Sequence, residues 1–282
     1  MTCDHWVRKT VRAGRLHAQT VVCEEVSQIS SYLWNDVAKA ALAGVQFLLL
    51  GDFAQLGVVL DSWAGAVVPE GAFETSDLLH ELSGGVRLTL TECRRCDAEL
   101  FQFYTSLGLC RTGGLRPVPR DLAEALAEAR LRYPKQAGDP TTTLVLAHAR
   151  RVHINRSQNL REKPKGAIFC KAPPGKKRGE NQPQSMWVYV GQRLITAKVR
   201  RGLFVFVTAA TAEGVTLDDG RTLACEDVCE NLRLSHAVTF ASCQGLTLQR
   251  RVRLETDHQA FTLTHLYVGT SRATAGSLLE VC

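Results

Sequence analysis

Acidic side chains follow two short apolar runs near the start of this 282-residue sequence. Glu24 and Glu25 come directly after the first run, and Asp52 and Gln55 follow the second. Paired carboxylates can bind a hard cation such as Mg²⁺, and a neighbouring base can orient a water molecule toward a phosphate. The alternative for Glu24 and Glu25 is the solvated end of a strand with no chemical role.

One glutamine and two arginines further along the chain are also expected at the ends of strands. Arg94 follows an apolar run, Gln244 stands before Gly245, and Arg272 ends the string Leu-Tyr-Val-Gly-Thr-Ser-Arg. A guanidinium group can offset the charge on a phosphoryl group during its transfer. For Arg94, the alternative is a surface salt bridge.

The elements around the two acidic groups predict an α/β fold. Residues 19–23 and 45–50 have the length and composition of parallel strands buried on both faces. Residues 32–43 between them have helical spacing, so the three segments form a parallel crossover unit. In such sheets the carboxyl ends of the strands form the ligand crevice, and both acidic groups fall there.

Beyond residue 85 we expect further alternation of strands and helices. The predicted strands cover residues 86–90, 144–147 and either 265–268 or 278–281. The predicted helices cover about 98–109, 121–130 and a segment beginning near 150. Residues 163–184, which include the basic run Lys176-Lys177-Arg178, are rich in Pro, Gly and Lys and predict an exposed loop. Residues 187–232 alternate short β-rich runs with turns and predict a small β-barrel or hairpin insertion.

The composition is that of a soluble globular protein, with 45% hydrophobic and 22% charged residues. The net charge of +6 is compatible with a polyanionic partner but is not specific for one. No apolar stretch has the length of a membrane span, so no membrane partner is expected. Nothing in the residues indicates an oligomeric state.

Ten cysteines are scattered through apolar stretches, which indicates reduced thiols in an intracellular compartment. The closest pair is Cys93-x-x-Cys96, with Cys110 beyond it. A zinc site needs a fourth ligand at suitable spacing, and no second Cys-x-x-Cys follows, so zinc is not expected.

Five segments occur in the order of the conserved motifs of superfamily 1 helicases, and the chain resembles the Pif/RecD-like branch of these P-loop ATPases. The segments resemble motifs II, III, IV, V and VI and cover residues 21–27, 50–56, 90–95, 239–248 and 265–273. Motif III is kept as Gly-Asp-x-x-Gln-Leu, and motif V keeps Gln-Gly-x-Thr. Departures are Cys93 for an aromatic residue, Arg95 for Gln, and Ala241-Ser242-Cys243 for His-Lys-Ser.

The resemblance implies ATP and Mg²⁺ as cofactors and assigns a role to each matched residue. Glu24 would bind Mg²⁺, and Glu25 would orient the attacking water. Gln55 would read the γ-phosphate, and Arg94 and Arg272 would act as arginine fingers. The nucleotide-binding set is completed by Asp52, Gln244 and Gly245, and the nucleic-acid-binding set consists of Ser242 and Thr247.

The family fold has two RecA-like domains with parallel sheets. By resemblance, residues 1–85 are the remnant of the first domain, and residues 86–282 form the second, with a β-rich insertion at about 185–235. The implied activity is ATP-dependent DNA unwinding with 5′-to-3′ translocation, in DNA repair or recombination. The implied partners are single-stranded DNA or DNA junctions rather than RNA. Glu25, Gln55, Arg94, Gln244 and Arg272 are predicted to converge on one interdomain cleft.

The sequence departs from the family at the phosphate-binding loop, because no Gly-x-x-x-x-Gly-Lys-Ser/Thr occurs. Family motors place this loop before motif II, so we expect a fragment or a degenerate relative, and no ATP turnover by this chain alone. Glu24 also replaces the usual aspartate, which displaces the carboxylate by about 1 Å, and such displacements can cost ~10²-fold in rate.

Two other interpretations stay open. The chain can be a non-catalytic nucleic-acid-binding relative that keeps the fold without turnover. It can also be an Upf-type RNA helicase, since motif III is shared with that group. Motifs V and VI favour the Pif/RecD-like branch.

Overall fold

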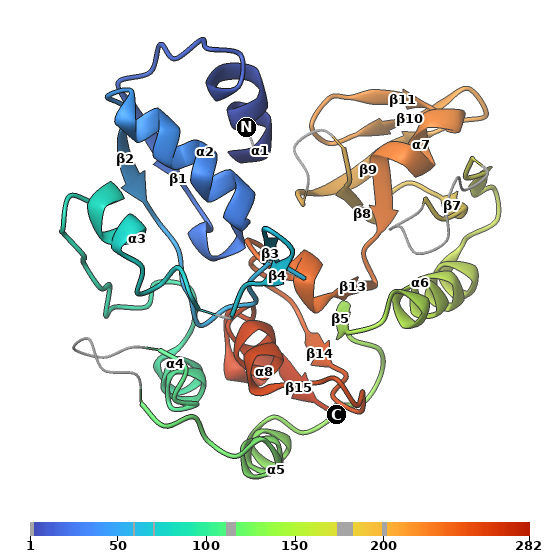
Figure 1. The fold of residues 1–282 in the computed structure, drawn as a ribbon. Helices are drawn as coiled ribbons and strands as arrows, with labels where there is room; N and C mark the ends of the chain where they lie inside the picture. The colour runs from blue at the N-terminus through green and yellow to red at the C-terminus, as the bar shows by residue number, and fades with distance from the viewer. Residues whose placement is uncertain (1–2, 59, 70, 111–116, 174–182, 199–201) are drawn as a thin grey trace. The chain divides into compact units, whose positions relative to one another are not determined.

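The computed structural model describes residues 3–58, 60–69, 71–110, 117–173, 183–198 and 202–282 (Figure 1). The chain forms two compact units. The first unit contains Met1–Arg94 and Gly108–Pro119, and the second contains Arg95–Leu107 and Arg120–Cys282. Within the described ranges, no helix is both long and apolar enough to cross a membrane.

The first unit is built on two parallel strands, β1 (Thr20–Cys23) and β2 (Gln46–Leu49), joined by helix α2 (Ser31–Leu42). Cys23 lies opposite Leu49 in the register. The predicted crossover unit of strand, helix and strand is therefore confirmed. The other elements are α1 (Cys3–Trp6), a π-helical turn (Val7–Val11), β3 (Ser62–Trp63), β4 (Ala66–Val67) and α3 (Asp77–Leu82).

Helix α2 is fixed at its first residue and along its buried face. The amide of Ser31 donates to both carboxylate oxygens of Asp61 at 3.2 and 3.1 Å, and its hydroxyl donates at 2.7 Å. A carboxylate at this end satisfies free amides and complements the helix dipole. Trp34 and Val37 on the helix pack with Cys23 in one hydrophobic cluster, so α2 covers the strand pair.

The expectation that these strands are buried on both faces is wrong. Cys23 is 6% exposed, whereas Val22 is 56% and Leu48 is 52% exposed. Successive side chains of a strand point to opposite faces, and only the face that packs against α2 is buried.

The prediction of a strand at residues 86–90 is also wrong. This segment forms no ladder with any described strand, and Leu88 and Leu90 are 86% and 92% exposed. A strand needs a neighbour that bonds its backbone groups, and an apolar run alone does not supply one.

The second unit contains a parallel sheet in the order β13-β5-β14-β15. Its strands are β5 (Thr142–Val145), β13 (Ala237–Thr239), β14 (Val252–Leu254) and β15 (Leu279–Val281). All four residues of β5 are buried, as expected for an interior strand of a parallel sheet. The strand predicted at residues 144–147 is confirmed, two residues earlier than expected.

Helices follow the predicted positions in most of this unit. They are α4 (Ala98–Thr105), α5 (Leu122–Arg132), α6 (His148–Glu162), α7 (Cys225–Asn231) and α8 (Leu263–Thr270). Asp97 and Asp121 cap α4 and α5 by accepting from backbone amides at 2.8 and 3.0 Å. The three helices predicted near residues 98, 121 and 150 are therefore confirmed.

Of the two strands considered at the end of the chain, residues 278–281 contain β15, while residues 265–268 are helical. The reason lies at residue 262, where Thr262 and His265 form a capping box that starts α8. A short apolar run is compatible with either state, and this local capping decides for the helix.

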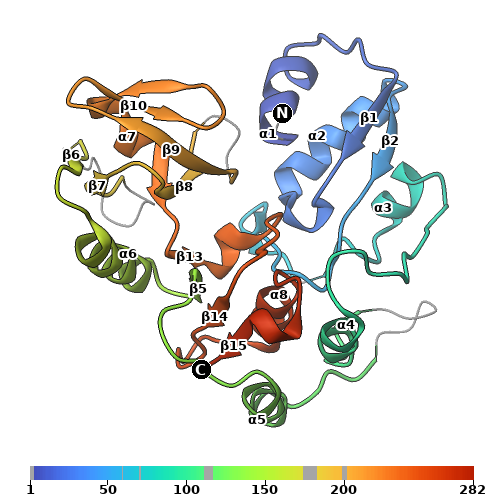
Figure 2. The ribbon, with the colours of Figure 1, turned by 180° about the vertical axis from the view of Figure 1, so that it is seen from behind.

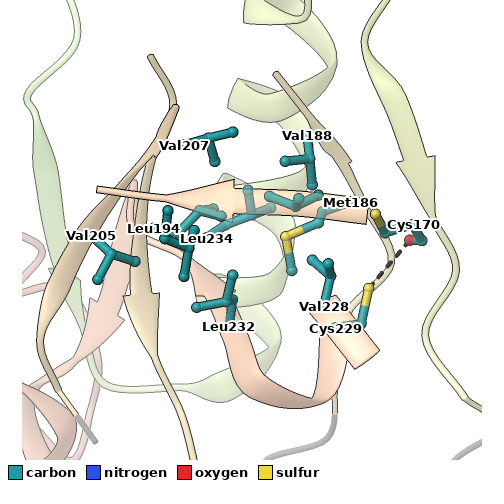
Figure 3. Close-up of a cluster of buried hydrophobic side chains, with 12 residues drawn as sticks. Cys170, Met186, Val188, Leu194, Val205, Val207, Val228, Cys229, Leu232 and Leu234 are labelled. Carbon is teal, nitrogen blue, oxygen red and sulfur yellow. Dashed lines mark hydrogen bonds between the residues drawn. The ribbon is translucent and has the colours of Figure 1, made fainter. Parts of the chain in front are cut away.

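The predicted β-rich insertion is confirmed as a curled antiparallel sheet in the order β11-β10-β9-β8-β12. Its strands are β8 (Arg193–Thr196), β9 (Phe204–Ala210), β10 (Gly214–Leu217), β11 (Thr222–Ala224) and β12 (Leu232–Leu234). Figure 3 shows its buried core, in which the Cys229 thiol donates to the Cys170 carbonyl at 3.2 Å. The insertion therefore shares one hydrophobic core with Cys170, which precedes it in the chain.

A further strand pair, β6 (Ile168–Cys170) and β7 (Met186–Val188), lies beside α6 (Figure 2). Because β6 falls within residues 163–184, the expectation of an uninterrupted loop there is wrong. The basic run Lys176-Lys177-Arg178 lies outside the described residues.

Candidate functional site

The acidic groups of the first unit lie at one edge of its sheet, because β1 and β2 run in parallel and end together. The amide of Leu50 donates to the Cys23 carbonyl at 2.8 Å, and the amide of Val26 donates to the Leu50 carbonyl at 3.1 Å. These two bonds extend the pairing beyond the strands. They hold the Glu24–Glu25 turn next to the segment that begins at Asp52.

Gly51 makes this close approach possible. A Cβ atom at this position would lie 2.6 Å from Cγ2 and 2.8 Å from the backbone nitrogen of Val26. Real side-chain contacts are not that short, so a larger residue would push the two segments apart. The glycine of the motif III string is therefore required for the geometry of this edge.

Glu25 has a left-handed backbone conformation, with φ 53° and ψ 47°. This region is sparsely populated by residues other than glycine, asparagine and aspartate, and it costs about 1–2 kcal/mol for a residue with a Cβ atom. Strained residues of this kind cluster at active sites and ligand clamps. Glu25 is thus a strained position, and Leu60 and Ala64 share its left-handed backbone conformation.

Asp52 and Gln55 form a small polar network after β2. Asp52 accepts from the Ala54 amide at 2.9 Å and from the Gln55 side-chain amide at 3.3 Å. The side-chain oxygen of Gln55 is buried and has no hydrogen-bond partner. A buried acceptor without a partner is costly and is suited to a water molecule or another donor that binds at this edge.

The donor set at this edge fits a magnesium ion that is held together with phosphate oxygens. No group of three or more His, Cys, Asp or Glu side chains within the described ranges is arranged to hold a metal. Mg²⁺ at ATP-binding sites usually takes one or two carboxylates and completes its shell with phosphates and water. Glu24 and Glu25 can supply such carboxylates.

Arg94 lies at the end of the first unit, and its side chain is 83% exposed. It forms an ion pair with Glu92 at 2.9 Å, which is the surface salt bridge considered as its alternative. Its neighbour Arg95 belongs to the second unit and donates to the Ser271 carbonyl at 3.3 Å. In the sequence, Arg95 stands out only as a departure from motif IV, and this contact was not predicted.

Motifs V and VI pack against each other within the second unit. The amide of Leu248 donates to the Arg272 carbonyl at 2.8 Å. A Cβ atom at Gly269 would lie 2.8 Å from the Phe240 ring, so this glycine lets α8 approach the 3₁₀ turn Phe240–Cys243 closely. The two segments that the sequence analysis singled out separately therefore form one structure.

Arg272 is 1% exposed and follows a helix, which corrects the expectation that every candidate residue lies at the end of a strand. Its Nη2 and Nε donate to the Ser271 hydroxyl at 3.0 and 3.3 Å. Burial raises the pKa of the Cys243 thiol to about 12, and the opposing effect of the Arg272 charge shows that the two side chains are close.

The remaining motif V residues lie in and directly after the 3₁₀ turn. Ser242 is half-buried, and its hydroxyl accepts from Thr239 at 2.9 Å. Gln244 is half-buried and also follows this turn rather than a strand, Gly245 has a φ of +77°, and Thr247 is exposed. Convergence of Gln244 and Arg272 with Glu25, Gln55 and Arg94 in one cleft stays a prediction.

Two arginines that the sequence analysis did not single out line a cavity together with Ser242. They are Arg151, on α6, and Arg233, on β12. A signal was available, because Arg151, Asn155 and Asn159 recur at a spacing of four and form the buried face of α6.

The comparisons with known proteins rest on structure alone. No protein-family profile and no curated protein matches the sequence. The Pif1 helicase from Candida albicans matches all of this chain and 76% of its own, with a TM-score of 0.64 and 18% identity. Bacteroides Pif1 bound to single-stranded DNA matches 93% of this chain and 70% of its own, with a TM-score of 0.63 and 16% identity. This chain has the fold of a Pif1 helicase.

A third solved structure, Bacteroides Pif1 in complex with ADP-AlF3 and single-stranded DNA, matches 94% of this chain with a TM-score of 0.60 and 16% identity. The predicted fold class, RecA-like α/β with a β-rich insertion, is confirmed by this likeness to Pif1 structures. Both Bacteroides complexes contain single-stranded DNA, and one of them also contains ADP-AlF3.

Proposed function

We propose that this chain is part of an ATP-dependent DNA helicase motor of the Pif1 type, which moves 5′ to 3′ along single-stranded DNA and separates duplexes. The observation that carries the proposal is the pairing of motifs within a Pif1 fold. Motif II lies beside motif III through Gly51, and motif V lies beside motif VI through Gly269. Chance matches to short strings would have no reason to meet in this way.

The proposal gives the acidic edge of the first unit the nucleotide chemistry. Glu24 would bind Mg²⁺, and Glu25 would hold the attacking water. Gln55, whose side-chain oxygen is buried without a partner, would accept a hydrogen bond from that water. Arg94 and Arg272 would offset charge on the transferring phosphoryl group, with Asp52, Gln244 and Gly245 lining the nucleotide.

The nucleic-acid partner in the proposal is single-stranded DNA or a DNA junction, contacted by Ser242 and Thr247. Repair or recombination of DNA is the process that we propose for it. We also propose an intracellular, reducing compartment, which is supported by the scatter of ten cysteines through apolar stretches of a chain of this length.

One specific observation favours a second function, that of a non-catalytic nucleic-acid-binding relative. The sequence contains no Gly-x-x-x-x-Gly-Lys-Ser/Thr, and that loop supplies the backbone amides and the lysine that hold the nucleotide phosphates. Such a relative would keep the DNA contacts of the fold and lose turnover.

The test is binding of a fluorescently labelled oligodeoxythymidylate over a series of salt concentrations, with an oligouridylate of equal length beside it. The proposal expects DNA affinity that falls steeply with salt, because contacts to phosphates dominate such binding. Salt-insensitive binding, or none at low salt, would contradict both functions. Clear preference for the oligouridylate would favour the Upf-type RNA helicase instead.

Magnesium-dependent ATP hydrolysis and unwinding of a forked duplex separate the two functions. Both assays need this chain and any longer product of the same gene. Hydrolysis and unwinding by the longer product establish the motor, and DNA binding without either activity in both proteins establishes the non-catalytic relative.

A further inference from the structure

Arg151 is a buried cation without a partner. The residue is 5% exposed, its Nε has no hydrogen-bond partner, and no carboxylate among the described residues pairs with it. Removal of a charge from water is expensive unless an opposite charge or hydrogen-bond acceptors replace the lost hydration. Arg151 therefore occupies a position that needs an anion.

A second guanidinium lies close to the first and is fixed in place. Nη1 of Arg233 donates to the Leu232 carbonyl at 2.9 Å and to the Glu230 carbonyl at 3.4 Å, at the end of α7. Burial lowers the pKa of Arg151, and the charge of Arg233 lowers it further. Two like charges held close together repel each other. An anion between them would therefore offset both this repulsion and the cost of burying Arg151 without a partner.

The two arginines line a cavity of about 280 Å³. This is several times the roughly 30 Å³ that one water molecule occupies, so a polyatomic ion fits. None of the lining residues in the described ranges is acidic, and the walls include Ile195 and Leu234. Ser242 also lines it, and because its oxygen accepts from Thr239, its own proton is available for donation.

We propose that this cavity binds a phosphoryl oxyanion, with Arg151 as the principal ligand and Arg233 and Ser242 as supporting donors. A guanidinium group is planar, remains charged, and presents paired N–H donors that match two phosphate oxygens. The ion comes from one of two sources, a backbone phosphate of a nucleic acid or a free phosphate group. The nucleic-acid source rests on the proposed function, whereas the free phosphate does not.

The first experiment measures thermal unfolding of the full chain in sodium phosphate and in sodium chloride at equal ionic strength. The variants are Arg151→Gln and, as matched control, Arg156→Gln, which removes the same charge from the exposed side of the same helix. Phosphate stabilises folded proteins in general, and binding at the site adds to this effect. Phosphate is therefore expected to raise the Tm of the wild type and of the control by more than it raises the Tm of Arg151→Gln.

The same variants separate a ligand from a structural residue in the absence of phosphate. Removal of an unpaired buried charge is neutral or stabilising, so the Tm of Arg151→Gln in chloride should equal or exceed that of the wild type. A loss of stability of equal size in both salts would mean that Arg151 supports the fold, and would overturn the proposal.

The second experiment identifies the source by binding labelled oligodeoxythymidylate over a range of salt concentrations. Loss of one phosphate contact lowers the slope of log affinity against log salt by about 0.7 for a single strand. This loss in Arg151→Gln, larger than in Arg156→Gln, assigns the site to a DNA phosphate. A phosphate-dependent Tm with unchanged DNA binding assigns it to a free phosphate group. Absence of both effects overturns the proposal, and the Tm result stands whether or not the chain is a helicase.

Discussion

The conformation of Glu25 is informative because it runs against the preference of the residue. A glutamate in the left-handed region is destabilised relative to glycine, and the turn after β1 keeps it there. A residue with only a structural role at this position would be expected to be glycine or asparagine. The strain at Glu25 therefore supports the role in holding water that we propose for its carboxylate.

The backbone strain at Glu25 predicts an unusual order of stability for two substitutions. Glu25→Gly should be more stable than Glu25→Ala by about 1 kcal/mol, because alanine keeps the backbone strain and glycine removes it. Urea unfolding measures the difference. The control is the same pair at Lys39, which is exposed on α2, where glycine should be less stable than alanine by about 1 kcal/mol. If the glycine variant were less stable than the alanine variant at both positions, residue 25 would be unstrained in solution.

A second prediction at the scale of residues concerns Asp36. Burial alone would raise the pKa of this carboxyl, but hydrogen bonds from Arg12 at 2.8 and 2.9 Å and from Lys39 at 3.4 Å outweigh burial and lower the pKa. A lowered pKa stabilises the fold above the unfolded value of about 3.9, and this contribution is lost as the pH falls through the folded value.

The expected result is that Asp36→Asn lowers the free energy of unfolding at neutral pH. The gap from the wild type should close as the pH drops below about 4, which unfolding by urea at several pH values would show. Asp257→Asn is the control, since that carboxylate is 88% exposed beside Arg130 and such pairs contribute little. A gap that stays constant with pH would contradict the assignment.

At the scale of elements, local sequence patterns were sufficient to predict those helices and strands whose signals lie within the element itself. The crossover of β1, α2 and β2 and the capped helices α4 and α5 carry their signals within about ten residues. The prediction of a strand at residues 86–90 failed because strand formation depends on a partner strand, which an apolar run does not reveal. The helix at α8 was missed because a capping box, rather than composition, determines it.

In the candidate site, too, some residues could be predicted from local sequence and others could not. Sequence motifs predicted Glu24, Glu25, Asp52 and Gln55 at one strand edge, since parallel strands place their carboxyl ends together. The Arg151–Arg233 cavity could not be predicted, because its arginines come from α6 and β12, which are far apart in the sequence. The spacing of four between Arg151, Asn155 and Asn159 indicates the buried face of α6, but the proximity of Arg151 to Arg233 is a property of tertiary packing.

Helix α6 connects the parallel sheet to the strand pair through two asparagines. Asn155 exchanges two hydrogen bonds with the backbone of Ala237 at 3.0 and 2.9 Å, and Asn159 does so with Trp187 at 2.8 Å each. An amide side chain is suited to this, because it donates and accepts at once and so satisfies an amide and a carbonyl of the same residue.

We therefore predict that Asn159→Ala lowers the free energy of unfolding by about 2 kcal/mol, since it leaves a backbone donor and acceptor unsatisfied. Asn159→Asp should be destabilised at least as much at neutral pH, because it would bury a carboxylate against the Trp187 carbonyl. Urea unfolding is the measurement, and Arg156→Ala on the exposed side of the helix should stay within about 0.5 kcal/mol of the wild type. An Asn159→Ala variant as stable as Arg156→Ala would show that the contact contributes nothing.

At the scale of the whole molecule, the motifs are divided between the two units. Motifs II and III belong to the first, and motifs V and VI belong to the second. Assignment of these units to the two domains of a helicase, with residues 1–85 and 86–282 as their extents, stays a prediction. In the motor that we propose, hydrolysis would need both sets of residues and a nucleotide whose phosphates are already held.

The final prediction is that this 282-residue chain does not hydrolyse ATP at the rate of a helicase motor, even with saturating DNA. A finger arginine contributes ~10³–10⁵ in rate, but only to a nucleotide that is already bound. Nothing in the sequence matches the loop that binds the β- and γ-phosphates. Steady-state hydrolysis of the chain is the measurement. Arg94→Ala is the first variant, because Arg94 is 83% exposed and its loss should not unfold the protein, whereas Arg272 is 1% exposed and is better tested as Arg272→Lys. Rapid hydrolysis that both substitutions abolish would mean that another element of this chain holds the phosphates.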